Sequence, residues 1–228
     1  GRLDKITRDL QDIGTSLRMV PIRSTFQKMV RLARDLSHRF EKQVEVVVSG
    51  EETELDRSMV DLVADPLVHM VRNTIDHGME TAEQRVAAGK APAGRIELRA
   101  FHHAGSIHVE VHDDGRGLDR EAILARAREN RLVTGDPALS DAEVYGMIFR
   151  PGFSTAQAVT DVSGRGVGLD VVKRNIESLR GTVDVNSTPG KGTTFTLRLP
   201  LTLAIIDGLM IRVGTERYVI PTLNVIRA

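Results

Sequence analysis

The sequence predicts an α+β fold for a chain of 228 residues, and three observations support that prediction. Stretches with apolar residues three or four positions apart, the spacing of one helix face, recur along the chain. Shorter stretches, in which apolar and polar residues alternate as in half-buried strands, lie between them. Hydrophobic residues make up 41% of the chain and charged residues 27%, a balance typical of a soluble globular protein.

Charge and cysteine content exclude several classes of function. The chain has 31 basic and 31 acidic side chains, so its formal net charge is zero and we expect no nucleic-acid partner. It has no cysteine, which excludes disulfides, thiolate metal sites and thiol nucleophiles and fits a cytoplasmic protein. The longest apolar run, residues 199–206, is too short to cross a membrane, so we expect no membrane insertion.

The first quarter of the chain predicts helices followed by a strand. Residues 2–19 have the apolar spacing of a coiled-coil or helical-hairpin seam, although an amphipathic helix packed on its own domain has the same pattern. Pro21 interrupts this pattern, and a second helix is expected up to Phe40. Alternation over 43–49 predicts a strand, and 56–77 predict a helix with a break at Pro66.

Three polar residues share one face of the helix expected over 56–77. His69, Asn73 and His77 are four positions apart, and Gly78 suits the C-terminal cap. Two imidazoles and an amide make a poor packing stripe, but they suit phosphate oxygens and a hard cation. The alternative is a solvated polar helix face without function.

A glycine-rich loop follows two strands expected over 95–101 and 107–111. Gly115 and Gly117 let the backbone turn tightly and approach a flat ligand, because neither has a Cβ atom. Asp113, just before them, can accept a hydrogen bond from an exocyclic amine such as adenine N6. A simple hairpin turn is the alternative interpretation.

A second glycine-rich loop lies between expected helices. After helices over 119–130 and 140–149, the small and polar residues 150–163 are typical of a mobile lid. Three alternating glycines within 163–168 then precede a helix over 169–179, whose first N–H groups suit a phosphate. The spacing matches neither a P-loop nor the dinucleotide fingerprint. Strands over 182–187 and 193–199 follow.

This ordered set of motifs resembles the Bergerat (GHKL) ATP-binding fold of histidine kinases, Hsp90-type chaperones, DNA gyrase and mismatch-repair ATPases. The set is a helix with Asn73, then Asp-x-Gly-x-Gly, Gly-x-Gly-x-Gly and Gly-Thr. The resemblance implies a two-layer α+β sandwich in which helices cover one face of a mixed sheet. Finer sequence detail at 69–78, 151–155, 163–173 and 199–206 is similar to the chemotaxis histidine kinase (CheA) family.

The resemblance also implies a domain organisation and partners. Residues 1–20 are similar to the end of a dimerisation helix, 21–200 to the kinase domain, and 201–228 to the first strands of an SH3-like, CheW-like regulatory domain. A homodimer, a CheW-like coupling protein, chemoreceptors and a response regulator are the implied partners. The family's phosphotransfer domain has no counterpart within these residues, so we expect the phosphorylated histidine on a separate phosphotransfer domain.

ATP and Mg²⁺ are the implied cofactors. The resemblance assigns Asp113 to the adenine amine, Gly115 and Gly117 to its pocket, Asn73 to Mg²⁺, and His69 and His77 to the phosphates or the metal's water shell. The further nucleotide contacts that it implies are Ser163, Gly164, Arg165, Gly166, Val167, Gly168 and Thr194.

The residue four positions before Asn73 bears on the type of reaction. Hydrolytic members of the fold have a water-activating glutamate there, whereas this chain has His69. The resemblance therefore implies phosphoryl transfer to a protein histidine, with an ATP hydrolase and a nucleotide-binding scaffold as alternatives. His38 lacks the surrounding motif of a phospho-accepting histidine, so we expect no acceptor within this chain.

Overall fold

The computed structural model describes residues 18–133, 139–151, 153, 168–201, 208–214 and 216–221. The expected N-terminal seam, most of the expected lid over 150–163 and the start of the second glycine-rich loop lie outside these residues.

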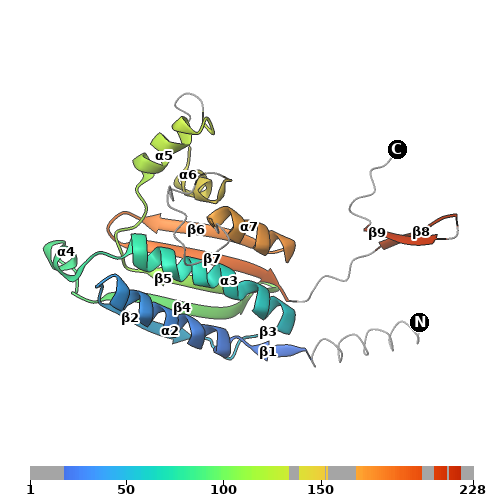
Figure 1. Cartoon of the computed structure of the whole chain (residues 1–228), viewed down its shortest axis with the longest axis horizontal. Coiled ribbons are helices and arrows are strands. Elements are labelled where there is room, and N and C mark those ends of the chain that lie inside the picture. Colours follow the sequence, from blue (N-terminus) through green and yellow to red (C-terminus); the bar gives the residue numbers. More distant parts are fainter. Residues whose placement is uncertain are drawn as a thin grey trace.

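A five-stranded mixed sheet forms the centre of the molecule, in the order β2-β4-β5-β7-β6 (Figure 1). Its strands are β2 (Val44–Ser49), β4 (Gly94–His103), β5 (Ser106–Asp113), β6 (Thr182–Thr188) and β7 (Gly192–Pro200). β2 pairs with β4 in parallel, and the other neighbours are antiparallel. The mixed sheet predicted from the resemblance is thus confirmed.

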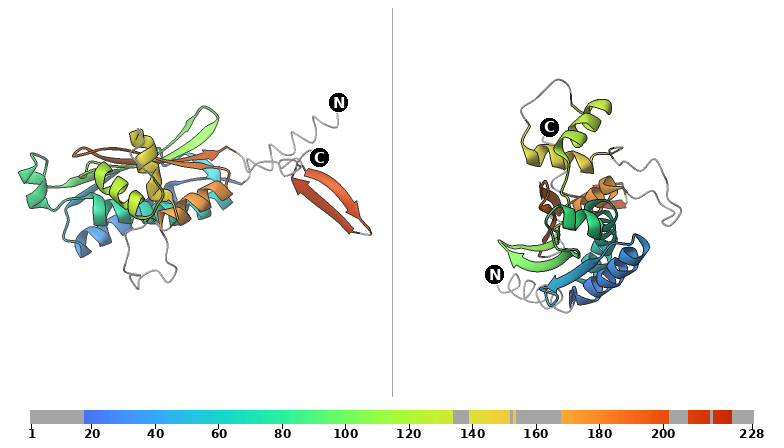
Figure 2. Two further views of the ribbon diagram at one scale, coloured as in Figure 1. Left: turned by 90° about the horizontal axis from the view of Figure 1, so that it is seen from above. Right: turned by 90° about the vertical axis from the view of Figure 1, so that its left-hand side faces the viewer.

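Helices cover one face of this sheet (Figure 2). They are α2 (Arg23–Arg39), α3 (Arg57–Asn73) and α7 (Leu169–Ser178), and α3 packs against both of the others. No described helix lies over the opposite face, where β4 and β5 place polar side chains such as Arg99 and Glu110. The predicted two-layer α+β sandwich is therefore confirmed.

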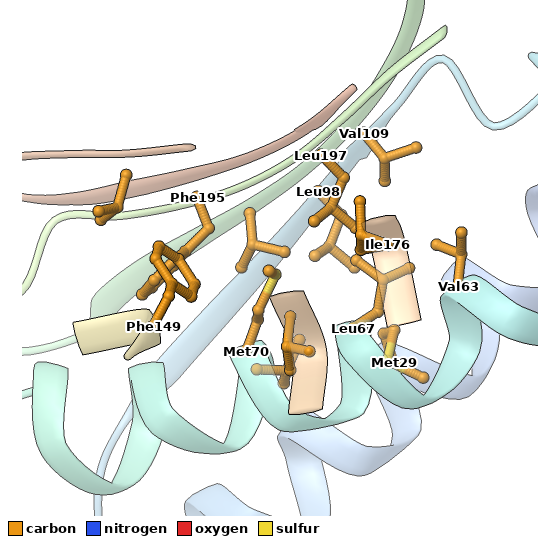
Figure 3. Close-up of a cluster of buried hydrophobic side chains, with 14 of the residues drawn as sticks. Met29, Val63, Leu67, Met70, Leu98, Val109, Phe149, Ile176, Phe195 and Leu197 are labelled. Atoms are coloured by element: carbon orange, nitrogen blue, oxygen red, sulfur yellow. The ribbon is translucent and has the colours of Figure 1, made fainter. Parts of the chain in front are cut away.

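The core lies between α3 and the sheet (Figure 3). Leu67 and Met70 of α3 meet Leu98 and Leu197 of the sheet, and all four side chains are fully buried. The burial of each contributes about 1.5–3 kcal/mol, which fixes the rotation of α3 about its axis. This packing determines which side chains of α3 point toward the carboxyl end of β5.

Two expectations about α3 were wrong. Pro66 does not break the helix, which continues from Arg57 to Asn73 although the proline lies inside it. An internal proline costs about 3 kcal/mol, and the buried apolar residues on both sides of Pro66 outweigh that cost. Gly78 is also not a left-handed cap: it ends a π-helical turn, η1 (Thr74–Gly78), in which Met79 N donates to Thr74 O at 2.7 Å.

The remaining elements are short. They are β1 (Met19–Pro21), which pairs with β3 (Glu54–Asp56), and α4 (Ala82–Ala87), α5 (Arg120–Glu129), α6 (Asp141–Gly146), η2 (Met147–Phe149) and the hairpin β8 (Gly208–Val213) with β9 (Glu216–Pro221). Ser140 caps α6 in a capping box: its side chain accepts from Glu143 N, and the Glu143 carboxylate accepts from Ser140 N. The strand pair β1–β3 was not predicted, because three-residue strands carry too little alternation.

Candidate nucleotide-binding site

Asp113 ends β5 on the helix-covered face of the sheet and is only 1% exposed. Its Oδ1 accepts two backbone hydrogen bonds, from Gly115 N at 2.9 Å and from Thr193 N at 3.3 Å. Burial raises the pKa of Asp113 to about 6, although both hydrogen bonds oppose this shift. Within the described part of the chain no group donates to Oδ2. One oxygen of a buried carboxylate is therefore free to accept a hydrogen bond from a ligand.

Gly115 allows the end of the helix that carries His69 and Asn73 to contact this loop. A Cβ atom at Gly115 would lie 2.3 Å from Gly78 O, so no larger residue fits at that position without backbone movement. Arg116 N donates to the same Gly78 O at 2.9 Å. A Cβ atom at Gly78 would lie 3.8 Å from both carboxylate oxygens of Asp113. The loop, η1 and the carboxylate thus meet.

The structure places the three polar residues of the site helix in different environments. His69 is partly buried; burial and the neighbouring Arg72 lower its pKa, while Asp170 of α7 opposes the shift. His77 lies within the π turn, its side chain is 69% exposed, and its Nε2 lies 3.6 Å from Asp76 Oδ2. His69 is therefore neutral near pH 7 and faces α7, whereas His77 faces solvent.

Asn73 occupies the last position of α3, between the two histidines, and is partly exposed. Among the described residues no group of three or more His, Asp or Glu side chains is arranged to hold a metal ion. An Mg²⁺ ion at Asn73 would thus need most of its oxygen ligands from phosphate and water, which is how Mg²⁺ is held in nucleotide sites.

The second glycine-rich loop is described only at its end. Ser163, Gly164, Arg165, Gly166 and Val167 lie outside the described residues. Gly168 is the N-terminal capping residue of α7, with no side chain to cap the first N–H groups. Because α7 packs beside α3, its amino end is on the same face of the sheet as Asn73.

The structure corrects the threonine predicted to lie near the nucleotide. Thr194 faces the uncovered side of the sheet, where its Oγ1 lies 2.9 Å from His112 Nδ1. Its neighbour Thr193 is opposite Asp113 in the register, is 4% exposed and donates its N–H to that carboxylate. Side chains alternate along a strand, so Thr193 and not Thr194 lines the site.

A charged group beneath the loop was not predicted either. Glu80, Arg85 and Lys90 surround Asp114 and the backbone of Gly115. From the sequence alone, Glu80, Arg85 and Lys90 are indistinguishable from ordinary solvent-exposed charges between two elements. Their participation was not foreseeable, because only the tertiary fold brings them under the loop.

These features fit an adenine nucleotide. Asp113 offers a free carboxylate oxygen, Gly78 and Gly115 leave no Cβ atom beside it, and Asn73 offers an amide oxygen. The profile of the histidine kinase-, DNA gyrase B- and HSP90-like ATPases matches residues 62–203, which include all of them. The chain belongs to that family.

Relatives narrow the assignment to the chemotaxis kinases. Chemotaxis protein CheA of Rhizobium meliloti is 46% identical over 219 residues, which are 96% of this chain and 29% of that protein. Chemotaxis protein CheA of Klebsiella aerogenes is 50% identical over 220 residues, which are 96% of this chain and 34% of that protein. The predicted CheA family is confirmed, and the chain spans about a third of the length of these relatives.

A solved structure confirms the fold. The nucleotide-free catalytic domain of histidine kinase ThkA matches with a TM-score of 0.51 and 15% identity, covering 81% of this chain and 95% of that one. Within the residues described, none of the helices has the length and apolar character to cross a membrane.

Proposed function

We propose that this chain binds Mg-ATP and transfers the γ-phosphate to a histidine on a separate phosphotransfer domain, in a chemotaxis-type two-component system. The observation that carries the proposal is the buried Asp113 carboxylate, whose Oδ1 is held by two backbone N–H groups while Oδ2 is left without a donor. Such a group can recognise an exocyclic amine, because a carboxylate oxygen that lacks a protein donor accepts a strong hydrogen bond from an N–H group.

The chain's own residues then have separate tasks. Asp113 Oδ2 accepts a hydrogen bond from adenine N6, and Asn73 is a ligand of the cation. Mg²⁺, when bound, would offset the negative charge that develops on the phosphate oxygens. His69 borders the phosphates in its neutral form, since its pKa is lowered by burial.

The transfer itself needs little covalent chemistry from the protein. A neutral ring nitrogen of the acceptor histidine forms a bond to the γ-phosphorus, the bond from phosphorus to the β,γ-bridging oxygen breaks, and ADP leaves. Positioning and charge compensation supply most of the rate in such reactions. Hydrolytic members of the fold have a water-activating glutamate where this chain has His69, and histidine has no carboxylate. This difference supports phosphoryl transfer over hydrolysis.

The proposed partners follow from the CheA relatives. They are a phosphotransfer domain as phosphate acceptor, a response regulator downstream, and a CheW-like coupling protein with chemoreceptors as the input. We propose that this protein acts in the cytoplasm as a homodimer.

One sequence of measurements tests the proposal. Calorimetric titration with ATP, with and without Mg²⁺, is followed by incubation with labelled ATP and an added phosphotransfer domain. Metal-dependent binding and label on the acceptor histidine are expected. Binding without transfer would instead indicate a scaffold, and phosphate release without acceptor would indicate a hydrolase. Asp113→Asn should lose binding, while Asp184→Asn, an exposed aspartate on β6, is the matched control.

A further inference from the structure

A fully buried arginine lies beneath the first glycine-rich loop. Arg85 of α4 is 1% exposed, although arginine is rarely buried without partners. Its Nη2 donates to Asp114 Oδ2 at 2.7 Å, its Nη1 to Glu80 Oε2 at 3.2 Å and to Asp114 O at 3.3 Å, and its Nε to Ala91 O at 2.7 Å. Every nitrogen of the guanidinium thus has a partner, and two of them bind Asp114.

Lys90 completes the group from the segment after α4. Its Nζ donates to Glu80 Oε1 at 2.9 Å, Asp114 O at 2.9 Å and Gly115 O at 2.7 Å. Burial opposes the ionisation of Glu80, but the hydrogen bond from Lys90 and the charges of Lys90 and Arg85 hold its pKa below the usual range. Two cations and two carboxylates therefore balance one another around the loop backbone.

These contacts fix the orientation of one peptide unit. The carbonyl of Asp114 and the N–H of Gly115 belong to the same planar trans peptide and point in opposite directions. Arg85 and Lys90 both bind the carbonyl, at 3.3 and 2.9 Å. The N–H on the other side of that peptide must then point at Asp113 Oδ1, to which it donates at 2.9 Å.

We propose that Arg85 and Lys90 are positioning residues for adenine recognition: they orient the Asp114–Gly115 peptide so that its N–H occupies Asp113 Oδ1 and leaves Oδ2 for the exocyclic amine. This inference rests on the proposed function of Asp113. Arg85 and Lys90 bind backbone carbonyls of the loop, so each acts through the loop backbone. If Arg85 and Lys90 only stabilised the fold, variants of these residues that still fold would recognise the exocyclic amine as the wild type does.

The test compares ATP with purine riboside 5′-triphosphate, which lacks the exocyclic amine. Wild-type chain with Mg²⁺ should bind ATP about tenfold to one-hundredfold more tightly, the range for one hydrogen bond to a charged group. Lys90→Met removes all three hydrogen bonds of a side chain that is 18% exposed, and it keeps an unbranched side chain of similar length in the same space. We expect its preference for ATP to fall below about threefold, with nearly unchanged affinity for the amine-free analogue.

Three variants accompany Lys90→Met. Lys90→Arg, which restores a cation with several donors, should recover most of the preference. Arg198→Met removes the cation of an ion pair to Asp184 and should keep the wild-type preference. Should Lys90→Met not fold, Lys90→Gln gives the same comparison, because its shorter and neutral side chain has two N–H donors and cannot make all three hydrogen bonds of the lysine.

A second readout needs no nucleotide. The hydrogen bond from Gly115 N–H to Asp113 Oδ1 favours the ionised carboxylate. If Lys90→Met loses this hydrogen bond, the pKa of Asp113 in the free chain should rise, which NMR titration measures. Folded Lys90→Met with the wild-type preference and an unchanged Asp113 pKa would overturn the inference alone. Wild-type chain that does not bind ATP, or does not prefer ATP over the analogue, would overturn the proposed function and the inference with it.

Discussion

At the scale of residues, Asp113 combines burial with hydrogen bonds on one oxygen only. Its pKa of about 6, against 3.8 for an unperturbed aspartate, means that the folded chain binds the proton more tightly than the unfolded chain does. The stability that this proton contributes is present below about pH 4 and is lost as the pH rises through about 6. A site built to bind an amine thus lowers the stability of the free protein at neutral pH.

The pH dependence of unfolding tests this statement. Asp113→Asn cannot titrate, so between about pH 4 and pH 7 the unfolding free energy of the wild type should fall relative to this variant by roughly 2–3 kcal/mol. Urea unfolding of both proteins across that range measures the difference. Asp184→Asn, at an exposed position, should show no such relative change, and parallel curves for wild type and Asp113→Asn would contradict the prediction.

Asn73 is the residue on which the proposed metal dependence rests. Asn73→Ala should reduce phosphotransfer to near background while the thermal unfolding curve stays close to wild type, because Asn73 is partly exposed. Asn73→Asp should shift the Mg²⁺ concentration that gives half-maximal rate. Initial rates at several Mg²⁺ concentrations measure both effects, with the exposed Asn186→Ala as control. Normal transfer by Asn73→Ala would remove this residue from the metal site.

A glycine is needed at position 115 because no Cβ atom fits there, and not because the backbone is in the left-handed region. A Cβ atom there would approach Gly78 O to 2.3 Å, so Gly115→Ala must separate the loop from η1. We expect a loss of about 1–3 kcal/mol in unfolding free energy and a weaker affinity for ATP. Gly146→Ala, which meets nothing within 4 Å, is the control. Chemical unfolding and calorimetry check the pair, and equal behaviour of the two variants would disprove the close contact.

At the scale of elements, the π turn joins the site helix to the loop. A π-helical segment rotates the chain differently from an α-helix, so His77 does not continue the face of His69 and Asn73. Lys42 stabilises this turn from the end of α2, where its Nζ donates to Ile75 O and Asp76 O, each at 2.7 Å. These are carbonyls that the end of a helix leaves without intrahelical partners.

Removal of that ammonium group should loosen the turn. Lys42→Met leaves two carbonyls without their donor, at an expected cost of about 1–2 kcal/mol in unfolding free energy. Hydrogen exchange at Met79 N, which closes the turn on Thr74 O, should accelerate. Lys191→Met, in an exposed turn of the sheet, should change neither quantity. Unchanged exchange at Met79 in Lys42→Met would show that the turn forms without the lysine.

At the scale of the whole molecule, the site lies at one end of the sheet and the histidines are distributed over both layers. His69 and His77 belong to the site helix, while His38 lies at the end of α2. His102, His103, His108 and His112 are on β4 and β5, where His108 packs against Phe101 and His103. None of these positions resembles an acceptor that can reach a γ-phosphate in line.

The chain alone with Mg²⁺ and labelled ATP should therefore not acquire acid-labile label on histidine, whereas an added phosphotransfer domain should. The chain without acceptor, and the Asp113→Asn variant with acceptor, are the two controls in the same experiment. Label that maps to His38 in the chain alone would contradict transfer to a separate domain.

Much of the fold and site followed from local sequence. The strand over 44–49 was predicted from the alternation of apolar and polar residues, and the helix α2 from its apolar spacing. An element with one buried face has apolar residues at regular intervals in the sequence. The capping box at Ser140 and the hydrogen bond from Gly115 N to Asp113, two residues earlier, depend on near neighbours alone. Motif order was sufficient for the family, since the ligand-contacting residues of this fold are few and come in a constant sequence.

Tertiary structure decided what depends on contacts between distant segments. Pro66 stays inside α3 because a buried apolar face outweighs its local cost, and that face exists only once the sheet has formed. Thr193 lines the site in place of Thr194 because the register with β5 assigns the face, and a shift of one residue reverses it. Arg85 is ordinary in sequence but is fully buried in the fold, since its partners Glu80, Ala91 and Asp114 meet only when α4 closes under the loop.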